Sequence, residues 1–335
     1  MQHPPLSVII VSWNGRRHLP ECLAALRPQL PAGAELVLVD NGSTDGTAAW
    51  VRAACPDAHL LALPRNLGFA GGVNAGLRAA RAPLMLLLND DAFVEPGFVD
   101  ALLAAATATP EAGAFAAVLT FAHRPERVAS AGVLLRRDGL ALDLWAGLPL
   151  AGLPPAPQPI AGPSGGAALY RRALLQDVGL MEAGFFSYLE DADLAWRALL
   201  RGWRSLVVPC ARARHVYSAT GGHGSPLKQR LLGRNRLRTI VRCMPGQLLA
   251  RCLPEILAYD LMAAAYGLLT GRPAMVEGRL EALRALPQLL RERRAIQRRR
   301  TAPLSAIARW LEPAPPPWRT LRAQRELDAI LRARS

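Results

Sequence analysis

Three short and unbroken apolar runs in the first part of the chain constrain its fold more than any other feature. They read SVIIVS, ELVLV and LMLLL, and they lie at 7–12, 35–39 and 84–88. Strands of this continuous apolar character occur in parallel sheets that are covered on both faces, because half-exposed strands alternate apolar and polar residues. Helical patterns separate the runs, at 18–27, 47–54 and 72–81. The sequence therefore predicts an α/β fold with a mostly parallel sheet flanked by helices.

In such sheets the ligand site lies just beyond the carboxyl ends of the strands. The segment VDNGSTDGT at 39–47 places Asp40 at one of these ends and follows it with turn-forming residues. Asp40 could accept hydrogen bonds from a nucleotide base or ribose. The segment is equally typical of a plain turn between strand and helix, with Thr44 or Asp45 as the helix cap, and the residues alone leave both interpretations open.

A second segment, RNLGFAGGVNAG at 65–76, contains four glycines where a helix begins. A backbone without side chains can approach a phosphate or a sugar closely, so the segment is a candidate nucleotide loop. Its spacing is not that of the dinucleotide fingerprint and it follows the third strand, which disfavours a dinucleotide oxidoreductase. A purely structural glycine-rich turn remains the alternative.

A third segment, LLLNDD at 86–91, ends a buried strand with Asn89, Asp90 and Asp91. Neighbouring carboxylates repel each other unless a cation or solvent lies between them. Oxygen ligands of this kind suit Mg²⁺ or Mn²⁺, although an acidic pair after a strand is also typical of a solvated helix start.

Two further segments carry candidate chemistry in the second half of the chain. In FFSYLEDADLAWR at 185–197, aromatic residues precede Glu190, Asp191 and Asp193 at the start of an amphipathic helix. The helix dipole stabilises ionised carboxylates there, and Asp191 beside the aromatic residues could act as a general base against a sugar-stacking wall. The alternative is a set of solvent-facing capping acids, above all for Asp193. His215 follows a strand expected at 204–208, and a lone histidine is more often structural than a metal ligand.

Taken together and in this order, these segments, with SVIIVSWNG, GGAALYRR and VPCARARH, resemble glycosyltransferase family 2 over about residues 6–242, especially its bacterial rhamnosyltransferase-like members. The resemblance implies a GT-A fold, a nucleotide-diphosphosugar donor, a divalent cation (Mg²⁺ or Mn²⁺) and inversion at the anomeric carbon. It also implies a glycan or lipid-linked glycan as acceptor. By the same resemblance, dTDP-rhamnose is the first donor to test.

The resemblance also implies roles for individual residues. Asp191 matches the family's base, with Glu190 beside it, while Asp91 takes the place of the metal-binding aspartate and His215 that of a histidine reaching the metal or diphosphate. The family's D-x-D motif is Asn89-Asp90-Asp91 here, which leaves open how Asp90 and Asp91 divide the metal. Residues expected at the donor are Ser12, Asn14, Asp40, Arg65, Asn66, Gly71, Asn74, Asn89 and Asp90.

We expect a GT-A catalytic domain at 1–245, with a donor half at 1–95 and an acceptor half at 96–245. A helical, basic extension follows at 246–335, and proline-rich residues at 312–318 precede a short terminal helix. Charged residues interrupt the apolar part of the extension and no signal peptide pattern opens the chain, so we expect no membrane-spanning helix. The five cysteines form no C-x-x-C pair and fit no disulfide framework, so we expect a cytoplasmic location, with peripheral contact at the inner face of the cell membrane as one option.

The formal charge of +14 calls for a polyanionic partner. Residues 197–242 hold eleven basic and no acidic residues, but they contain no recognisable nucleic-acid module, so no nucleic acid is expected. An anionic membrane surface fits leucines at near-helical spacing (Leu253, Leu257, Leu261, Leu268 and Ile256) together with six arginines at 291–300. The same stripe could pack on the catalytic domain or on a second subunit. A sugar-nucleotide-binding protein without turnover is the alternative to an enzyme.

Overall fold

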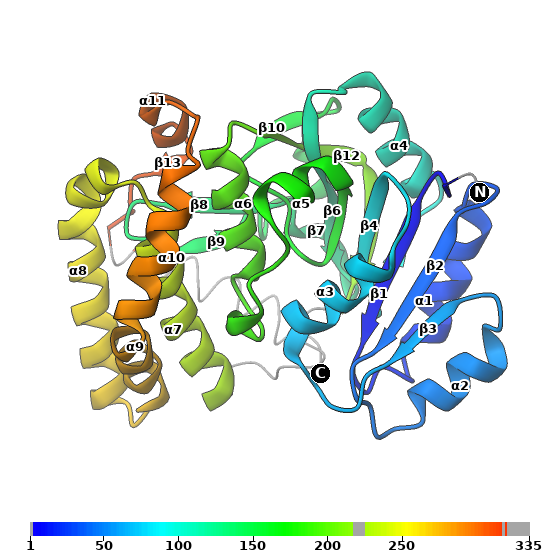
Figure 1. The fold of residues 1–335 in the computed structure, drawn as a ribbon, viewed down its shortest axis with the longest axis horizontal. Coiled ribbons are helices and arrows are strands. Elements are labelled where there is room, and N and C mark those ends of the chain that lie inside the picture. Colours follow the sequence, from blue (N-terminus) through cyan, green and yellow to red (C-terminus); the bar gives the residue numbers. More distant parts are fainter. Residues whose placement is uncertain (1–2, 217–224, 317–318, 320–335) are drawn as a thin grey trace.

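The structure is a computed structural model that describes residues 3–216, 225–316 and 319. A large mixed sheet runs through its centre with the strand order β10-β12-β6-β11-β4-β1-β2-β3, while β5 pairs with β12 and β7 with β6 (Figure 1). The donor half is parallel, as predicted. Its strands are β1 (Ser7–Ser12), β2 (Glu35–Asp40), β3 (His59–Ala62) and β4 (Leu84–Asn89), and its helices are α1 (Leu19–Leu26), α2 (Thr47–Ala54) and α3 (Gly68–Ala79).

The second half adds strands of both directions to the same sheet. β11 (Ala167–Arg171) lies antiparallel between β4 and β6 (Ala112–Phe121), and β12 (Arg204–His215) is parallel to β6. The other strands are β5 (Ala92–Val94), β7 (Arg124–Ser130), β8 (Val133–Arg136), β9 (Ala141–Asp143) and β10 (Gln158–Ile160). The helices are α4 (Phe98–Ala108), α5 (Arg172–Val178) and α6 (Glu190–Leu200), with 3₁₀ turns η1 (Arg27–Gln29), η2 (Leu150–Gly152) and η3 (Ala183–Phe185).

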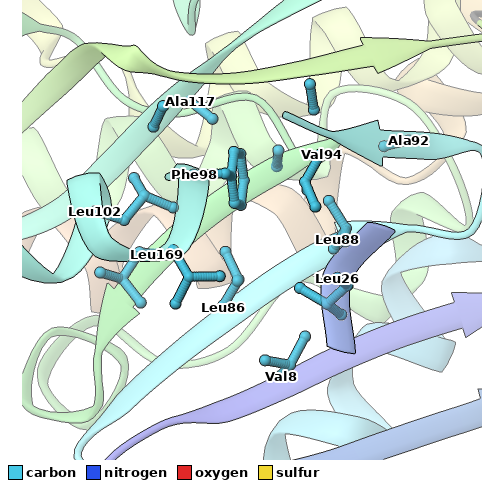
Figure 2. Packing of buried hydrophobic residues seen from close by; sticks show 14 of the residues in the cluster. Val8, Leu26, Leu86, Leu88, Ala92, Val94, Phe98, Leu102, Ala117 and Leu169 are labelled. Carbon is cyan, nitrogen blue, oxygen red and sulfur yellow. The ribbon is translucent and has the colours of Figure 1, made fainter. Parts of the chain in front are cut away.

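Apolar side chains from both halves pack into one core against this sheet. Figure 2 shows Phe98 and Leu102 of α4 near Leu86 and Leu88 of β4, with Leu26 of α1 beside them. All five side chains are buried. Burying a large apolar side chain contributes about 1.5–3 kcal/mol, so this shared core fixes the position of the strand ends where the site lies.

Helices in the last third of the chain pack against α6 and β8. α7 (Pro226–Cys243) lies within the expected catalytic domain, and the basic extension forms α8 (Gly246–Leu269), α9 (Ala274–Arg284), α10 (Leu286–Arg298) and α11 (Leu304–Ala308). A short strand, β13 (Leu311–Glu312), pairs with β8 of the catalytic half. Trp196 of α6 shares a hydrophobic cluster with Leu248 of α8 and Ile307 of α11, so the two sides of the expected division at 245/246 share a core. The expected terminal helix lies outside the described residues.

Several expected boundaries change in the structure. α3 begins at Gly68 instead of residue 72. β12 continues past the expected end at 208 to His215, because a bulge around Pro209 and Cys210 shifts its pairing with β6 without ending the strand. His215 therefore lies on a strand.

We expected no helix that could span a membrane. Judged by length and composition alone, this expectation was wrong. Within the described residues, α8 is long and apolar enough, because an 18-residue stretch of it carries no more than two charged residues. Only 22% of that stretch is buried inside the protein, unlike a core helix.

Candidate active site

The register of the parallel strands brings the predicted acids and polar residues to one edge of the sheet. Ser12 lies opposite Asp40 on β2, and the preceding residue of β1 lies opposite Asn89 on β4. The Ser12 hydroxyl donates a 2.5 Å hydrogen bond to Asp90 Oδ2. Gly15 leaves room for this contact, because a Cβ there would lie 1.8 Å from the same carboxylate oxygen. The loop after β1 therefore closes directly on the acids after β4.

Asp90 and Asp91 occupy different electrostatic surroundings although they are neighbours. Burial, followed by the charge of Asp91, raises the pKa of Asp90 to about 7. Burial also raises the pKa of Asp91, but the charge and hydrogen bond of His215 outweigh burial and lower it. Asp91 Oδ1 lies 2.9 Å from His215 Nε2. Asp91 is therefore the carboxylate that stays ionised most readily. Asp90 is the carboxylate whose protonation an added positive charge would change most.

His215 completes this cluster from the end of β12. Its Nε2 also lies 3.2 Å from Asn89 Nδ2. Burial lowers the pKa of His215, but the Asp91 carboxylate outweighs burial and raises it. The structure thus brings both Asp91, expected at the metal, and Asn89, expected at the donor, into contact with His215.

The donor atoms of this cluster fit a divalent cation that is shared with a substrate. The carboxylate oxygens of Asp90 and Asp91 are suitable ligands for Mg²⁺ or Mn²⁺. Across the described residues, no set of three or more histidine, cysteine or acidic side chains is arranged to hold a metal ion by itself. Mg²⁺ is commonly bound through one or two carboxylates together with substrate phosphates, so a site of this composition suits a cation that arrives with a diphosphate.

Asp191 lies at the first turn of α6 and faces the start of β11. Its Oδ2 accepts a 2.9 Å hydrogen bond from Gly165 N, and its Oδ1 accepts one of 2.7 Å from Ala192 N. The side chain is half-buried. Burial raises the pKa of Asp191, and the two backbone hydrogen bonds offset only part of that rise. Asp191 is thus a fixed carboxylate with increased proton affinity, which suits a general base.

Gly165 and Gly166 connect Asp191 with the acids after β4. Gly165 donates to Asp191, while the next residue, Gly166, accepts a 2.9 Å hydrogen bond from Asn89 N. A Cβ on Gly166 would lie 3.7 Å from Asn89 Nδ2 and 4.0 Å from His215 Cε1. Consecutive Cα atoms are about 3.8 Å apart, so two adjacent residues span from the candidate base to the candidate metal site.

Glu190 and Asp193, the neighbours of Asp191, are both buried. Burial, and then the charge of Asp191, raises the pKa of Glu190 well above its ordinary value, and Glu190 Oε2 has no hydrogen-bond partner among the described residues. Asp193 forms ion pairs with Arg197 at 2.8 Å and with Arg242 at 3.1 Å. The interpretation of Asp193 as a solvent-facing cap was wrong, because its carboxylate anchors α6 inside the protein.

The segment 185–189 before α6 has an unusual backbone that other elements hold in place. Phe186, Tyr188 and Leu189 all have positive φ, between 65° and 72°. Asn235 of α7 donates from Nδ2 to the carbonyl oxygens of Phe185, Ser187 and Tyr188, at 2.8–3.0 Å. Residues in this region of φ cost about 1–3 kcal/mol each and persist only when their surroundings fix them. Asn235 therefore helps to set the position of Glu190 and Asp191.

Asn14 joins the loops after β1 and β2, and Asn41 joins the loop after β2 to the loop after β3. Asn14 Oδ1 accepts a 2.8 Å hydrogen bond from Thr44 N, and its own backbone N–H donates to Ser43 Oγ. Asp40 is buried and its Oδ1 accepts from Ser43 N at 3.3 Å. Asn41 accepts from Leu67 N at 2.9 Å and thereby fixes the glycine-rich loop. Asn14 and Asp40 thus lie at the expected strand ends, and their roles toward a donor stay predictions.

The glycines at 65–76 serve close packing in this structure. The first backbone N–H groups of the loop and helix are bonded within the protein: Gly68 to Asn66 Oδ1, Phe69 to Ser187 Oγ and Ala70 to the Phe186 carbonyl. A Cβ on Gly72 or Gly76 would lie 2.6 Å or 2.3 Å from a β1 side chain. The phosphate-cradle interpretation gains no support, because these donors are already engaged.

Of the residues expected at the donor, Arg65 is exposed on this loop and Gly71 lies within α3. Asn74 is buried, and both ends of its amide bond the backbone of Met181, at 2.7 Å and 3.0 Å. We therefore interpret Asn74 as a residue that holds the segment before α6, and not as a donor-binding residue as expected.

The sequence analysis assigned no individual role to Gly15, Asn41, Gly165, Gly166 or Asn235, although the first four lie in segments that it singled out. Adjacent glycines before a strand were a visible signal for Gly165 and Gly166. The buried amides gave none, because the importance of Asn41 and Asn235 depends on contacts with segments that are distant in the chain.

The chain matches the family model described as "Glycosyl transferase family 2" over residues 7–179. It is 31% identical over 231 residues to the N-acetylglucosaminyl-diphospho-decaprenol L-rhamnosyltransferase of Mycobacterium tuberculosis (strain ATCC 25618 / H37Rv), which covers 63% of this chain and 75% of that protein. It is also 35% identical over 95 residues to the succinoglycan biosynthesis protein ExoO of Rhizobium meliloti (strain 1021), covering 28% of this chain and 27% of that protein.

Solved structures share the fold. GalNAc-T7 with UDP, GalNAc and Mn²⁺ superposes with a TM-score of 0.58 at 17% identity, over 72% of this chain and 48% of that chain. TarS 1–349 from S. aureus in complex with UDP-GlcNAc gives 0.54 at 18% identity, over 87% of this chain and 88% of that chain. These likenesses confirm the predicted GT-A fold. Together with the match over residues 7–179, they lead to one conclusion: the chain belongs to glycosyl transferase family 2.

Proposed function

We propose that this chain is an inverting glycosyltransferase that moves a sugar from a nucleoside-diphosphate donor to a hydroxyl group of an acceptor. The observation that carries the proposal is the short connection from Asp191 through Gly165 and Gly166 to Asn89 and His215. A single displacement needs a base on the acceptor side and charge neutralisation on the leaving-group side. The two clusters supply these functions at neighbouring positions.

In this mechanism Asp191 removes the proton of the acceptor hydroxyl while that oxygen attacks the anomeric carbon of the donor sugar. The bond from the anomeric carbon to the diphosphate breaks, and the nucleoside diphosphate leaves with the bonding electron pair. Attack from the face opposite the leaving group inverts the anomeric configuration. The Gly165 N–H keeps the Asp191 carboxylate oriented toward the acceptor, and its raised pKa favours proton uptake.

Asp91, His215 and Asp90 would hold a divalent cation, Mg²⁺ or Mn²⁺, together with the donor diphosphate. When bound, the cation neutralises the charge that develops on the leaving diphosphate. The solved structure of GalNAc-T7 contains UDP and Mn²⁺, which supports this assignment by likeness of fold. Ser12 orients Asp90 through its hydrogen bond, and Asn89 sits against the His215 ring.

For the substrates, we propose dTDP-rhamnose as donor and a lipid-linked diphosphate glycan as acceptor. The support is the mycobacterial relative, whose name specifies rhamnosyl transfer to a diphospho-decaprenol-linked sugar. We place the enzyme in the cytoplasm, at the inner face of the membrane that would carry such an acceptor. Asp40, Asn14, Arg65 and Asn66 line the side of the donor nucleotide in this proposal.

A thermal-shift panel of dTDP-, UDP- and GDP-sugars, each with and without Mn²⁺, tests the donor site. A ligand at a hundred times its Kd stabilises the folded state by about 2.7 kcal/mol, which gives a readily measured rise in Tm. We expect the largest rise with a dTDP-sugar plus Mn²⁺. A panel in which every sugar nucleotide leaves Tm unchanged would contradict the proposal.

A further inference from the structure

The outer face of α8 is apolar along its last five turns. Every exposed residue from 252 to 269 lacks charge, and seven of these residues are large: Leu253, Leu257, Leu261, Met262, Tyr266, Leu268 and Leu269. Leu261 is 72% exposed and Leu269 is 87% exposed. With a rise of about 1.5 Å per residue, this face extends for about 25 Å. Apolar surfaces of this extent on soluble proteins mark contact sites for partners or membranes.

The charged residues of the same stretch point into the protein. Asp260 forms ion pairs with Arg236 of α7 at 2.7 Å and with Arg279 of α9 at 2.8 Å. Glu255 Oε2 accepts a 3.2 Å hydrogen bond from Ala314 N. From residue 252 to 269 the helix therefore keeps its acids on the protein side and presents only uncharged side chains to the outside.

Positive charge flanks the apolar face. Arg251 and Arg272 lie exposed before and after it, and the Arg272 guanidinium stacks 5.6 Å from the centre of the Tyr266 ring. Residues 246–335 contain sixteen arginines and eight acids. Exposed arginines continue on and just after α10, at Arg291, Arg294, Arg298, Arg299 and Arg300. An apolar face with basic flanks is complementary to an anionic lipid surface, where each nearby arginine adds to the attraction.

The packing of α8 favours lying on a membrane over crossing it. Ile256 and Ala263 of the inner face are buried against the protein, and Asp260 is held by two arginines of neighbouring helices. A spanning orientation would have to break these ion pairs in a low-dielectric medium. α8 forms the outer edge of the helical extension, at the end of the molecule opposite β3 (Figure 1).

We propose that the outer face of α8 docks the protein onto the surface of an anionic membrane, with the helix lying in the interface. The purpose of the contact rests on the lipid-linked acceptor of the proposed function, whereas its physical basis does not. Of the leucine stripe expected from sequence, Leu253, Leu257, Leu261 and Leu268 face outward, and Ile256 packs on the protein.

Flotation of the purified full-length chain with vesicles tests this surface. We expect binding to vesicles of equal parts phosphatidylcholine and phosphatidylglycerol, weak binding to phosphatidylcholine alone, and a loss of binding in high salt. The double variant Leu257→Glu/Leu261→Glu should lower the partition coefficient by roughly tenfold or more, because two anchoring side chains leave the interface and two negative charges enter it. The matched control is Leu142→Glu/Leu148→Glu, which changes two exposed leucines outside α8 and should bind like the wild type.

Three results would overturn the proposal: no flotation with anionic vesicles, equal flotation of both double variants, or a lipid-free dimer that the α8 variant alone dissociates. Sedimentation without lipid detects that dimer and would assign the face to a second copy of the chain. The thermal-shift panel, run without vesicles on the α8 variant, separates this proposal from the proposed function. If the donor stabilises the protein but vesicles do not bind it, only the docking proposal is contradicted. If vesicles bind the protein but no donor stabilises it, only the proposed function is contradicted.

Discussion

Asp91 and Asp191 are far apart in the sequence, yet Gly165 and Gly166 link their surroundings in the folded chain. The two acids differ in a way that suits different roles. His215 lowers the pKa of Asp91, so this carboxylate is ionised and ready for a cation. Burial raises the pKa of Asp191, so it is the better proton acceptor.

Asp191→Asn should nearly eliminate transfer while leaving donor binding close to that of the wild type. The amide keeps the size of the side chain but cannot take the acceptor proton, and loss of a positioned base costs about a hundredfold or more. Steady-state transfer rates and the donor-induced rise in Tm measure the two effects separately. Normal turnover by the variant would mean that another residue is the base.

Asp91→Ala should abolish transfer together with the dependence of donor binding on a divalent cation. The variant loses the ionised carboxylate that contacts His215. The donor-induced rise in Tm, with Mn²⁺ and with EDTA, is the readout, and the exposed Asp100→Ala serves as control. Full activity of the wild type in EDTA would rule out the metal.

Glu190→Gln should stabilise the protein at neutral and alkaline pH. The pKa of Glu190 is raised in the folded state, so the folded chain binds this proton more tightly than the unfolded chain. Its contribution to stability is fully present below the unfolded pKa of about 4.3 and is lost as pH rises through the folded value. The Tm of the variant minus that of the wild type should therefore grow from acid to alkaline pH. A difference that is constant with pH would show that Glu190 is not held protonated.

The segment 185–189 is the element on which the geometry of α6 depends most. It receives hydrogen bonds from Asn235 of α7 and from Ala70 N of α3, so the helix with Asp191 is tied to both α7 and the glycine-rich loop. Arg242 adds a second link, because it pairs with Asp193 of α6 and with Glu292 of α10.

Asn235→Ala should lower kcat more than it changes the donor KM. Three carbonyl groups lose a donor, and a buried polar group without a partner costs about 1–3 kcal/mol, so Tm should fall as well. Leu232→Ala, at an exposed position on the same helix, is the control. A fall in Tm with kcat unchanged would limit Asn235 to a structural role.

The sequence predicted the donor-half elements well because their apolar runs are continuous and end in polar residues. It gave no clear signal for β6, whose residues AGAFAAVLTF are rich in alanine and do not alternate between apolar and polar, although the strand is buried along its whole length. The strand end at His215 was equally hidden behind the bulge at Pro209. Acids at strand ends were predictable, whereas the amides that position them depend on tertiary contacts.

At the scale of the whole molecule, the catalytic half and the helical extension form one structure. β13 of the extension pairs with β8, and apolar residues from both parts share a hydrophobic cluster. The proposed membrane face on α8 is connected to α7 by the ion pair of Asp260 with Arg236, and α7 holds the segment before the candidate base through Asn235.

The most direct test of the central proposal is the anomeric configuration of the product. Purified chain would be incubated with dTDP-rhamnose, Mn²⁺ and a lipid-linked diphospho-sugar, with UDP- and GDP-sugars in parallel, and the product would be analysed by NMR. We expect one sugar to be transferred with its anomeric configuration opposite to that in the donor. Transfer with retained configuration, or no transfer from any of these donors, would contradict an inverting glycosyltransferase with Asp191 as its base.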